Sequence, residues 1–186
     1  MDVKIPAIVI PLLLLLCGCA SHVGRLPPLP SGDGAPYLLG AGDTLQVVVY
    51  DQPDLSGTFR ISGSGMIAMP LVGTVAAHGL TVDQFQQRLV ERLQASALKS
   101  PDVTLSVSEY RPFFILGEVR NPGSYAYVPN MTVLTAVAIA GGFTYRASER
   151  EISVTRVADG KPLESQAFRD SRVLPGDVVY VFERHL

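Results

Sequence analysis

The alternation of apolar and polar residues predicts mainly β-strands from residue 45 onward. Short apolar or alternating runs are bounded by Gly, Pro, Asn or Ser, which is typical of strands joined by turns. The segment Ser62–Gly65 resembles the turn of a hairpin between two of these runs. The predicted strands lie at residues 45–50, 59–61, 66–69, 103–107, 113–116, 124–128, 152–157 and 178–182.

Two segments have the pattern of helices. Thr81 can cap the first, whose apolar face carries Val82, Phe85, Leu89, Val90 and Leu93. Residues 132–140 are nearly all apolar and end at Gly141-Gly142, which suit the left-handed backbone at a helix C-terminus. From residue 111 onward, the order strand, strand, helix, strand, strand predicts a small α+β domain with one helix across a sheet.

The N-terminus has the pattern of a bacterial lipoprotein signal peptide. The apolar run Ile5–Leu16 is shorter than the roughly 20 residues that span a bilayer. Leu16-Cys17-Gly18-Cys19 resembles a lipobox, in which the last cysteine thiol is alkylated by a diacylglyceryl group. We therefore expect residues 1–18 to be removed and Cys19 to carry the lipid, with palmitate-like acyl chains. An uncleaved helical anchor is the alternative.

The cysteine count and the following residues agree with this expectation. Of the two cysteines, Cys17 would leave with the signal peptide, so the mature chain would have no disulfide. Ala20 stands where aspartate would direct retention in the inner membrane, which favours the periplasmic face of the outer membrane. Residues 19–36 are rich in Pro, Gly and Ser and predict an extended tether.

Composition and motifs favour a protein that is not an enzyme. The net charge is −2 without a basic run, which makes a nucleic-acid partner unlikely on electrostatic grounds. His22, His78 and His185 have no metal-binding spacing, and Ser62–Gly65 is not a nucleophile elbow. Asp51 and Asp54 fit a solvated acidic turn better than a glycosidase pair. We expect no catalytic residue, metal or cofactor.

Two further features leave alternatives open. Five aromatic residues can be core residues, subunit contacts or the lining of a sugar path: Tyr110, Phe113, Phe114, Tyr125 and Tyr127. Separately, the pattern Gly-Asp-x-apolar-x-Val occurs at residues 42–47 and again at 176–181. In both copies glycine permits a turn and aspartate can bind nearby backbone amides. The simplest interpretation is two independent turns, each opening a strand.

Taken together, the motifs resemble the bacterial polysaccharide-export (outer-membrane auxiliary, capsule translocon) family. Residues 37–47 match the opening of its export domain, and later segments match its SLBB domain, a β-grasp module. The resemblance predicts an export domain at residues 37–110 and an SLBB domain at 111–186. Ser64-Gly65 departs from the usual Asp-Gly. The other matching segments are Ile67–Gly73, Gly79–Thr81, Pro101–Val103, Gly117–Gly123, Val133–Ala136, Ala140–Gly142 and Pro175–Val181.

The resemblance implies a subunit of an oligomeric ring that conducts a capsule polysaccharide or exopolysaccharide. Its implied partners are further copies of itself in a cyclic octamer, an inner-membrane polysaccharide co-polymerase, the polysaccharide cargo and the lipid bilayer. The chain resembles the short branch of the family, without the C-terminal membrane helix, so we also expect a separate outer-membrane β-barrel as partner. The alternative is an SLBB lipoprotein that binds a soluble ligand or glycan and has no transport role.

Overall fold

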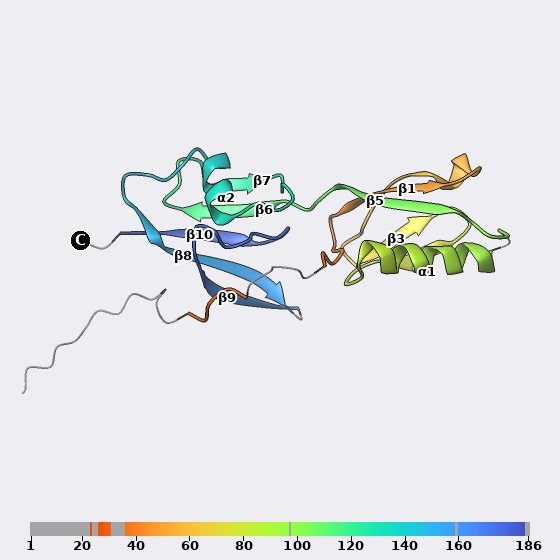
Figure 1. Ribbon diagram of the computed structural model, residues 1–186, viewed down its shortest axis with the longest axis horizontal. Helices are drawn as coiled ribbons and strands as arrows, with labels where there is room; N and C mark the ends of the chain where they lie inside the picture. The colour runs from red at the N-terminus through yellow and green to blue at the C-terminus, as the bar shows by residue number, and fades with distance from the viewer. Residues whose placement is uncertain (1–22, 24–25, 31–35, 97, 159, 185–186) are drawn as a thin grey trace, which may run out of the picture.

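The computed structural model describes residues 23, 26–30, 36–96, 98–158 and 160–184. They form two α+β units that lie end to end, the first containing the strands up to Glu109 and the second those from Phe113 (Figure 1). Each unit has its own sheet and its own hydrophobic core. The expected α+β fold class is confirmed. Within the described residues, no helix has the length and apolar character needed to cross a membrane.

The first unit packs one helix against a three-stranded sheet. Strand β1 is the centre of this sheet, antiparallel to β2 on one side and to β5 on the other. Strands β3 and β4 form a separate hairpin. The buried core includes Leu45 and Val47 of β1 and Phe85 and Leu89 of α1. The elements are β1 (Thr44–Val49), η2 (Pro53–Leu55), β2 (Gly57–Arg60), β3 (Met66–Met69), β4 (Gly73–Ala76), α1 (Val82–Ala95) and β5 (Val103–Glu109).

Helix α1 begins where the sequence predicted it. The Thr81 hydroxyl accepts a hydrogen bond from the Gln84 amide at 3.2 Å, and the Gln84 side chain accepts one from the Thr81 amide at 3.0 Å. This capping box satisfies two of the amide groups that have no partner within the helix. Phe85, Leu89 and Leu93 are fully buried, so the predicted apolar face is confirmed.

The turn at Ser62–Gly65 forms, but it does not join a hairpin. The Gly65 amide donates to the Ser62 carbonyl at 2.9 Å, which closes the turn. The strands on either side belong to different sheets, because β2 pairs with β1 and β3 pairs with β4. The predicted hairpin between residues 59–61 and 66–69 was therefore wrong. The partner of β3 is β4, which the sequence did not predict because Val75 is its single buried residue.

The second unit has the strand order of a β-grasp fold. Its sheet is ordered β7-β6-β10-β8-β9, so the first and last strands of the unit lie side by side at the centre and are parallel. The other neighbours are antiparallel, and α2 lies between the second and third strands in the chain. The elements are β6 (Phe113–Gly117), β7 (Gly123–Tyr125), α2 (Val133–Ile139), β8 (Ala147–Ala158), β9 (Lys161–Ala167) and β10 (Val178–Glu183).

Most of the second unit follows the prediction, but β7 ends at Tyr125 instead of Val128, and two further strands differ. Thr132 caps α2, and Gly141 and Gly142 adopt φ of 86° and 93°, as the helix end requires. Strand β8 begins at Ala147, earlier than expected, and β9 was not predicted at all. Strand β9 is polar at most positions, and it is buried only towards its end, where Ser165 and Ala167 face inward.

Part of the described N-terminal segment, residues 26–30, lies against the second unit. The Gln166 amide donates to the Pro27 carbonyl and the Leu29 amide donates to the Gln166 carbonyl, both at 2.8 Å. Pro28 thereby forms a parallel bridge with Gln166, alongside β9. Leu29 packs against the core of the second unit, and Val23 is 2% exposed. Residues 19–36 were predicted to form an extended tether, and within them residues 27–29 are bound to the second unit.

Candidate functional site at the joint between the two units

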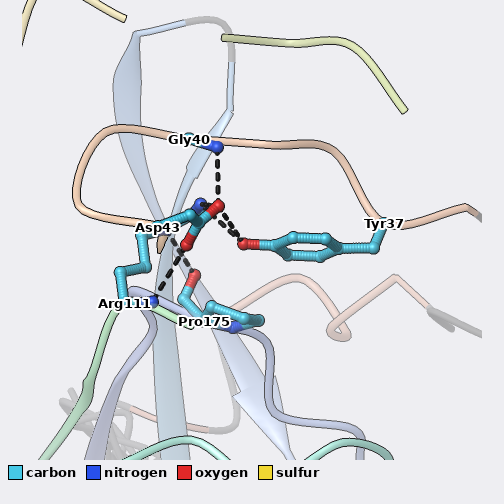
Figure 2. A network of polar contacts seen from close by, with 5 residues as sticks. All are labelled: Tyr37, Gly40, Asp43, Arg111 and Pro175. Atoms are coloured by element: carbon cyan, nitrogen blue, oxygen red, sulfur yellow. Dashed lines mark hydrogen bonds and ion pairs between the residues drawn. The ribbon is translucent and has the colours of Figure 1, made fainter. Parts of the chain in front are cut away.

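We call the region where the two units meet around Arg111 the joint. At its centre is the buried carboxylate of Asp43. The turn Gly40-Ala41-Gly42 leads into β1, with Gly42 at a φ of 96° that favours glycine. This turn aims the Gly40 amide at Asp43 Oδ2, 2.8 Å away, and the Tyr37 hydroxyl donates to the same oxygen at 2.6 Å (Figure 2). Asp43 is 0% exposed, so these donors replace the water that the charge has lost.

Arg111 joins this carboxylate to the second unit. Its backbone amide donates to Asp43 Oδ1 at 2.9 Å, and its Nη1 donates to Oδ2 at 3.1 Å. Its Nε donates to the Pro175 carbonyl of the second unit at 3.0 Å (Figure 2). Nη1 also donates to the Tyr37 hydroxyl at 2.9 Å, and the guanidinium lies over the Tyr37 ring. One side chain therefore binds both units in a fixed geometry.

The second Gly-Asp turn lies at the same joint. Asp177 Oδ2 accepts from the Leu174 amide and from Arg156 Nη2, both at 2.7 Å, so its carboxylate is held much as that of Asp43 is. The Gly176 amide donates to the carbonyl of Pro112, the residue after Arg111. The interpretation of two independent turns is thus wrong, because both turns bind the segment Arg111-Pro112.

Glycine at both turns is explained by the space that Arg111 occupies. A Cβ atom on Gly40 would lie 2.1 Å from Arg111 Nη1, and one on Gly176 would lie 2.8 Å from Nε. Both distances are shorter than real Cβ contacts. Any side chain at either position would displace the guanidinium from its partners. Glycine is therefore needed at both positions to leave room for the Arg111 side chain.

Tyrosine side chains extend the joint away from the ion pair. The Tyr37 and Tyr110 rings meet edge to face with centroids 5.1 Å apart, and Tyr110 meets Tyr127 in the same way at 5.4 Å. Burial and the hydrogen bond to Asp43 raise the pKa of the Tyr37 hydroxyl, and burial raises the pKa of Tyr127. Tyr37 therefore remains a neutral hydrogen-bond donor at physiological pH.

The substitution Tyr37→Phe is expected to lower the free energy of unfolding at pH 7 by about 2 kcal/mol, because it removes a hydrogen bond to a buried charge. Since the folded-state pKa of Tyr37 is raised, its contribution is present below about pH 10 and is lost as the pH rises above that value. Urea unfolding of both proteins between pH 7 and pH 11 should show the difference shrinking. Tyr50→Phe, at a residue that is 78% exposed, is the control and should change little.

The aromatic residues singled out in the sequence divide between core and surface. Phe113 is fully buried, and Tyr125 stacks on it with centroids 6.0 Å apart. Tyr110 and Tyr127 belong to the joint. Phe114 is 41% exposed on the face of the second sheet that lies away from the core, and it is the most exposed of the five.

The remaining sequence candidates stay outside the joint. Cys19, His22 and His185 lie outside the described residues. Asp51 and Asp54 lie in the exposed turn at η2, and His78 follows β4 against Gly65. Among the residues that the structure describes, no group of three or more His, Cys, Asp or Glu side chains could hold a metal ion.

The sequence did not reveal Arg111 as the centre of the joint. An isolated arginine between two predicted units has no motif, and its partners are 64 to 74 residues away in the chain. Tyr37 was noted only as part of the opening motif, and Asp43 as part of that motif and of the repeated Gly-Asp pattern. The repeated Gly-Asp turn was the one available signal, since two similar turns at the ends of two units can meet where the units join.

Comparison with known proteins agrees with this division of the chain. Residues 31–108 match the family described as polysaccharide biosynthesis/export protein, and residues 112–165 match the SLBB domain. Arg111 lies in the short gap between the two matches.

Three relatives share parts of the chain. The exopolysaccharide production protein ExoF of Rhizobium meliloti (strain 1021) is 33% identical over 118 residues, which cover 57% of this chain and 28% of ExoF. The EPS I polysaccharide export outer membrane protein EpsA of Ralstonia solanacearum is 28% identical over 172 residues, 77% of this chain and 45% of EpsA. The polysialic acid transport protein KpsD of Escherichia coli is 28% identical over 108 residues, 57% of this chain and 19% of KpsD.

The chain spans less than half the length of each of these relatives. Its two matched segments nevertheless follow one another in the order of the two structural units, and each contains most of a separate core. The chain therefore belongs to the polysaccharide biosynthesis/export family, with an export domain followed by one SLBB domain.

Proposed function

We propose that this chain is a lipid-anchored subunit of a ring-shaped conduit that carries a capsule polysaccharide or exopolysaccharide across the periplasm. The relatives are named for exopolysaccharide production, polysaccharide export and polysialic acid transport, which supports a transport component and not an enzyme. The proposal includes a cyclic octamer, docking on an inner-membrane co-polymerase, and attachment at the periplasmic face of the outer membrane through Cys19.

The observation that carries the proposal is the joint at Arg111. A ring of two-domain subunits closes only if every subunit presents both domains at the same angle. The ion pair of Arg111 with Asp43, together with the Arg111 hydrogen bond to Pro175, supports such a fixed angle. A binding protein that acts alone has no comparable need for a rigid joint.

The outer face of the first sheet is suited to contact with a sugar polymer. On this face, the residues of β1, β2 and β5 alternate with the buried ones, and Arg60 is its one cationic side chain. Hydroxyl and amide groups donate and accept hydrogen bonds with sugar hydroxyls without the strong attraction of a charge. The face comprises Thr44, Gln46, Val48, Tyr50, Thr58, Arg60, Thr104, Ser106, Ser108 and Glu109, which pairs with Thr44.

The proposed assembly is tested on the purified, lipidated protein. Electron micrographs and mass photometry are expected to show rings of one subunit number. Deletion of the chain should abolish export and leave polymer in the periplasm. A protein that stays monomeric at high concentration contradicts the ring, and normal export after deletion favours the ligand-binding alternative.

The proposed polymer surface is tested by enlarging one small residue on it. Ser106→Trp is expected to lower export several-fold, because the indole would project from the face that contacts the polymer, while stability and ring formation stay unchanged. Gln87→Trp, on the exposed side of α1, is the matched control and should export normally. Equal export by the two variants would show that the polymer does not pass along this face.

A further inference from the structure

A cleft lies on the surface of the second unit, where β8 begins and β9 ends. These two segments lie side by side because the strands are antiparallel, with Ile152 and Ala167 as their last pair (Figure 1). The cleft is open to solvent and has a volume of about 730 Å³. Sites for small ligands typically have volumes of about 300–1,000 Å³. The cleft is lined by Glu149, Arg150, Gln166, Phe168, Arg169 and Asp170.

The turn that carries half of this lining is held firmly by hydrogen bonds. The Phe168 amide donates to Ser171 Oγ at 2.8 Å, and the Ser171 amide donates to the Phe168 carbonyl at 3.0 Å. The carbonyls of Arg169 and Ser171 accept from the Leu134 and Val133 amides, both at 2.9 Å. Those amides begin α2 and have no partner within the helix. The turn is therefore in place before a ligand arrives, which reduces the entropy lost on binding.

The charges of the lining balance one another. Arg169 forms an ion pair with Glu149 of β8, and its guanidinium lies over the Phe143 ring, 6.0 Å from the ring centroid. Arg150 and Asp170 add one charge of each sign, so the lining as a whole has no net charge. A cleft without net charge does not attract phosphate groups or other strongly charged ligands.

The remaining polar side chains of the lining are available to a ligand. Within the part of the chain that the structure describes, Arg150, Gln166 and Asp170 have no side-chain hydrogen bond or ion pair. They supply guanidinium donors, an amide that both donates and accepts, and carboxylate acceptors. The Phe168 ring beside them is 55% exposed. A pyranose fits such a set, because its C–H groups form an apolar face for an aromatic ring and its hydroxyls both donate and accept hydrogen bonds.

We infer that this cleft is a saccharide-binding site for uncharged pyranose units of the transported polymer. The Phe168 ring stacks on one sugar, and Arg150, Gln166 and Asp170 bind its hydroxyls. The inference rests on the polysaccharide cargo of the proposed function. It adds a site in the SLBB domain that is separate from the polymer surface proposed on the first sheet.

Binding is measured by isothermal titration calorimetry on the purified, lipidated protein, in a detergent without a sugar headgroup. The probes are neutral hexasaccharides of glucose or mannose in several linkages, and fragments of the polysaccharide that the producing cells secrete. A galacturonate hexasaccharide is the charged control. The protein is expected to bind at least one neutral probe and the secreted fragments with a Kd of about 1 mM or lower, and the galacturonate more weakly.

Variants of the lining locate the binding site. Phe168→Ala is expected to raise the Kd about ten-fold, because it removes the stacked ring, whereas Phe168→Tyr keeps a ring and should bind normally. Asp170→Ala should also raise the Kd several-fold. Tyr145→Ala is the matched control, since this tyrosine is 82% exposed in the same unit and does not line the cleft. Urea unfolding of each variant verifies that the second unit is folded.

Three outcomes would overturn the inference. These are the absence of binding by every neutral probe and by the secreted fragments, tighter binding of galacturonate than of all neutral probes, and equal effects of Phe168→Ala and Tyr145→Ala. Ser106→Trp, on the first sheet, is expected to leave the Kd unchanged. If it abolishes binding while Phe168→Ala does not, the sugar binds on the first sheet, so the cleft is refuted and the proposed function stands. The proposed function fails separately, through the ring and export experiments, which do not involve the cleft.

Discussion

Arg111→Met is expected to lower the free energy of unfolding by about 3 kcal/mol and to uncouple the two units. Removing one partner of a buried ion pair leaves an uncompensated charge, at a typical cost of about 3–5 kcal/mol. The lower end applies here because the Tyr37 hydroxyl and the amides of Gly40 and residue 111 would still bind Asp43. Urea unfolding measures the stability, and small-angle scattering measures whether the molecule bends at the joint.

Arg156→Met is the matched control for this prediction. Arg156 binds the buried carboxylate of Asp177 through Nε at 2.9 Å and Nη2 at 2.7 Å, but both residues belong to the second unit. Its loss should destabilise that unit but change the angle between the units less than Arg111→Met does, because the Leu174 amide still binds Asp177 and the Gly176 amide still binds Pro112. The role of Arg111 as a joint is refuted if the two variants give the same scattering profile as the unmodified protein.

Gly117→Ala is expected to destabilise the second unit by about 3 kcal/mol. Gly117 has a φ of 83°, which costs an L-residue about 1–2 kcal/mol. A Cβ atom there would also lie 2.1 Å from the Val181 carbonyl oxygen, a backbone atom at the centre of the sheet. Displacement of that oxygen would strain the hydrogen bond that the Glu118 amide donates to it at 2.9 Å, with a further cost of about 1–3 kcal/mol.

Gly73→Ala separates the two contributions. Gly73 has a similar φ of 75°, but no atom lies within 4 Å of the position of its missing Cβ. Thermal or urea unfolding should therefore show a loss of only about 1–2 kcal/mol for Gly73→Ala. An equal loss for the two variants would mean that the close approach of Gly117 to β10 contributes nothing.

The parts of the fold that were predicted from the sequence are those set by local chemistry. Helix α1 was predicted because its cap and apolar face lie within one segment, and the end of α2 because two glycines supply the backbone that it needs. The order of the motifs also identified both domains. None of these predictions depends on which residues meet across the fold.

The parts that were not predicted depend on contacts between distant residues. Strand β9 has little alternation of its own and is a strand because β8 pairs with it along its length. Residues 27–29 were predicted only as part of an extended tether, because their composition is that of a linker, and the two hydrogen bonds that join them to Gln166 could not be read from that composition. Arg111 is central because Asp43 and Pro175, 68 and 64 residues away, both reach it.

The position of β10 determines when the second domain can fold. This strand is the last of the domain in the chain but lies at the centre of the sheet, between β6 and β8. A growing chain that ends before Val178 leaves β6 and β8 without their common neighbour, so the sheet cannot assemble strand by strand during synthesis. Pairing over such a separation also carries a large loop-closure cost and slows folding. The domain therefore assembles in a late, concerted step, after the whole of its chain is available.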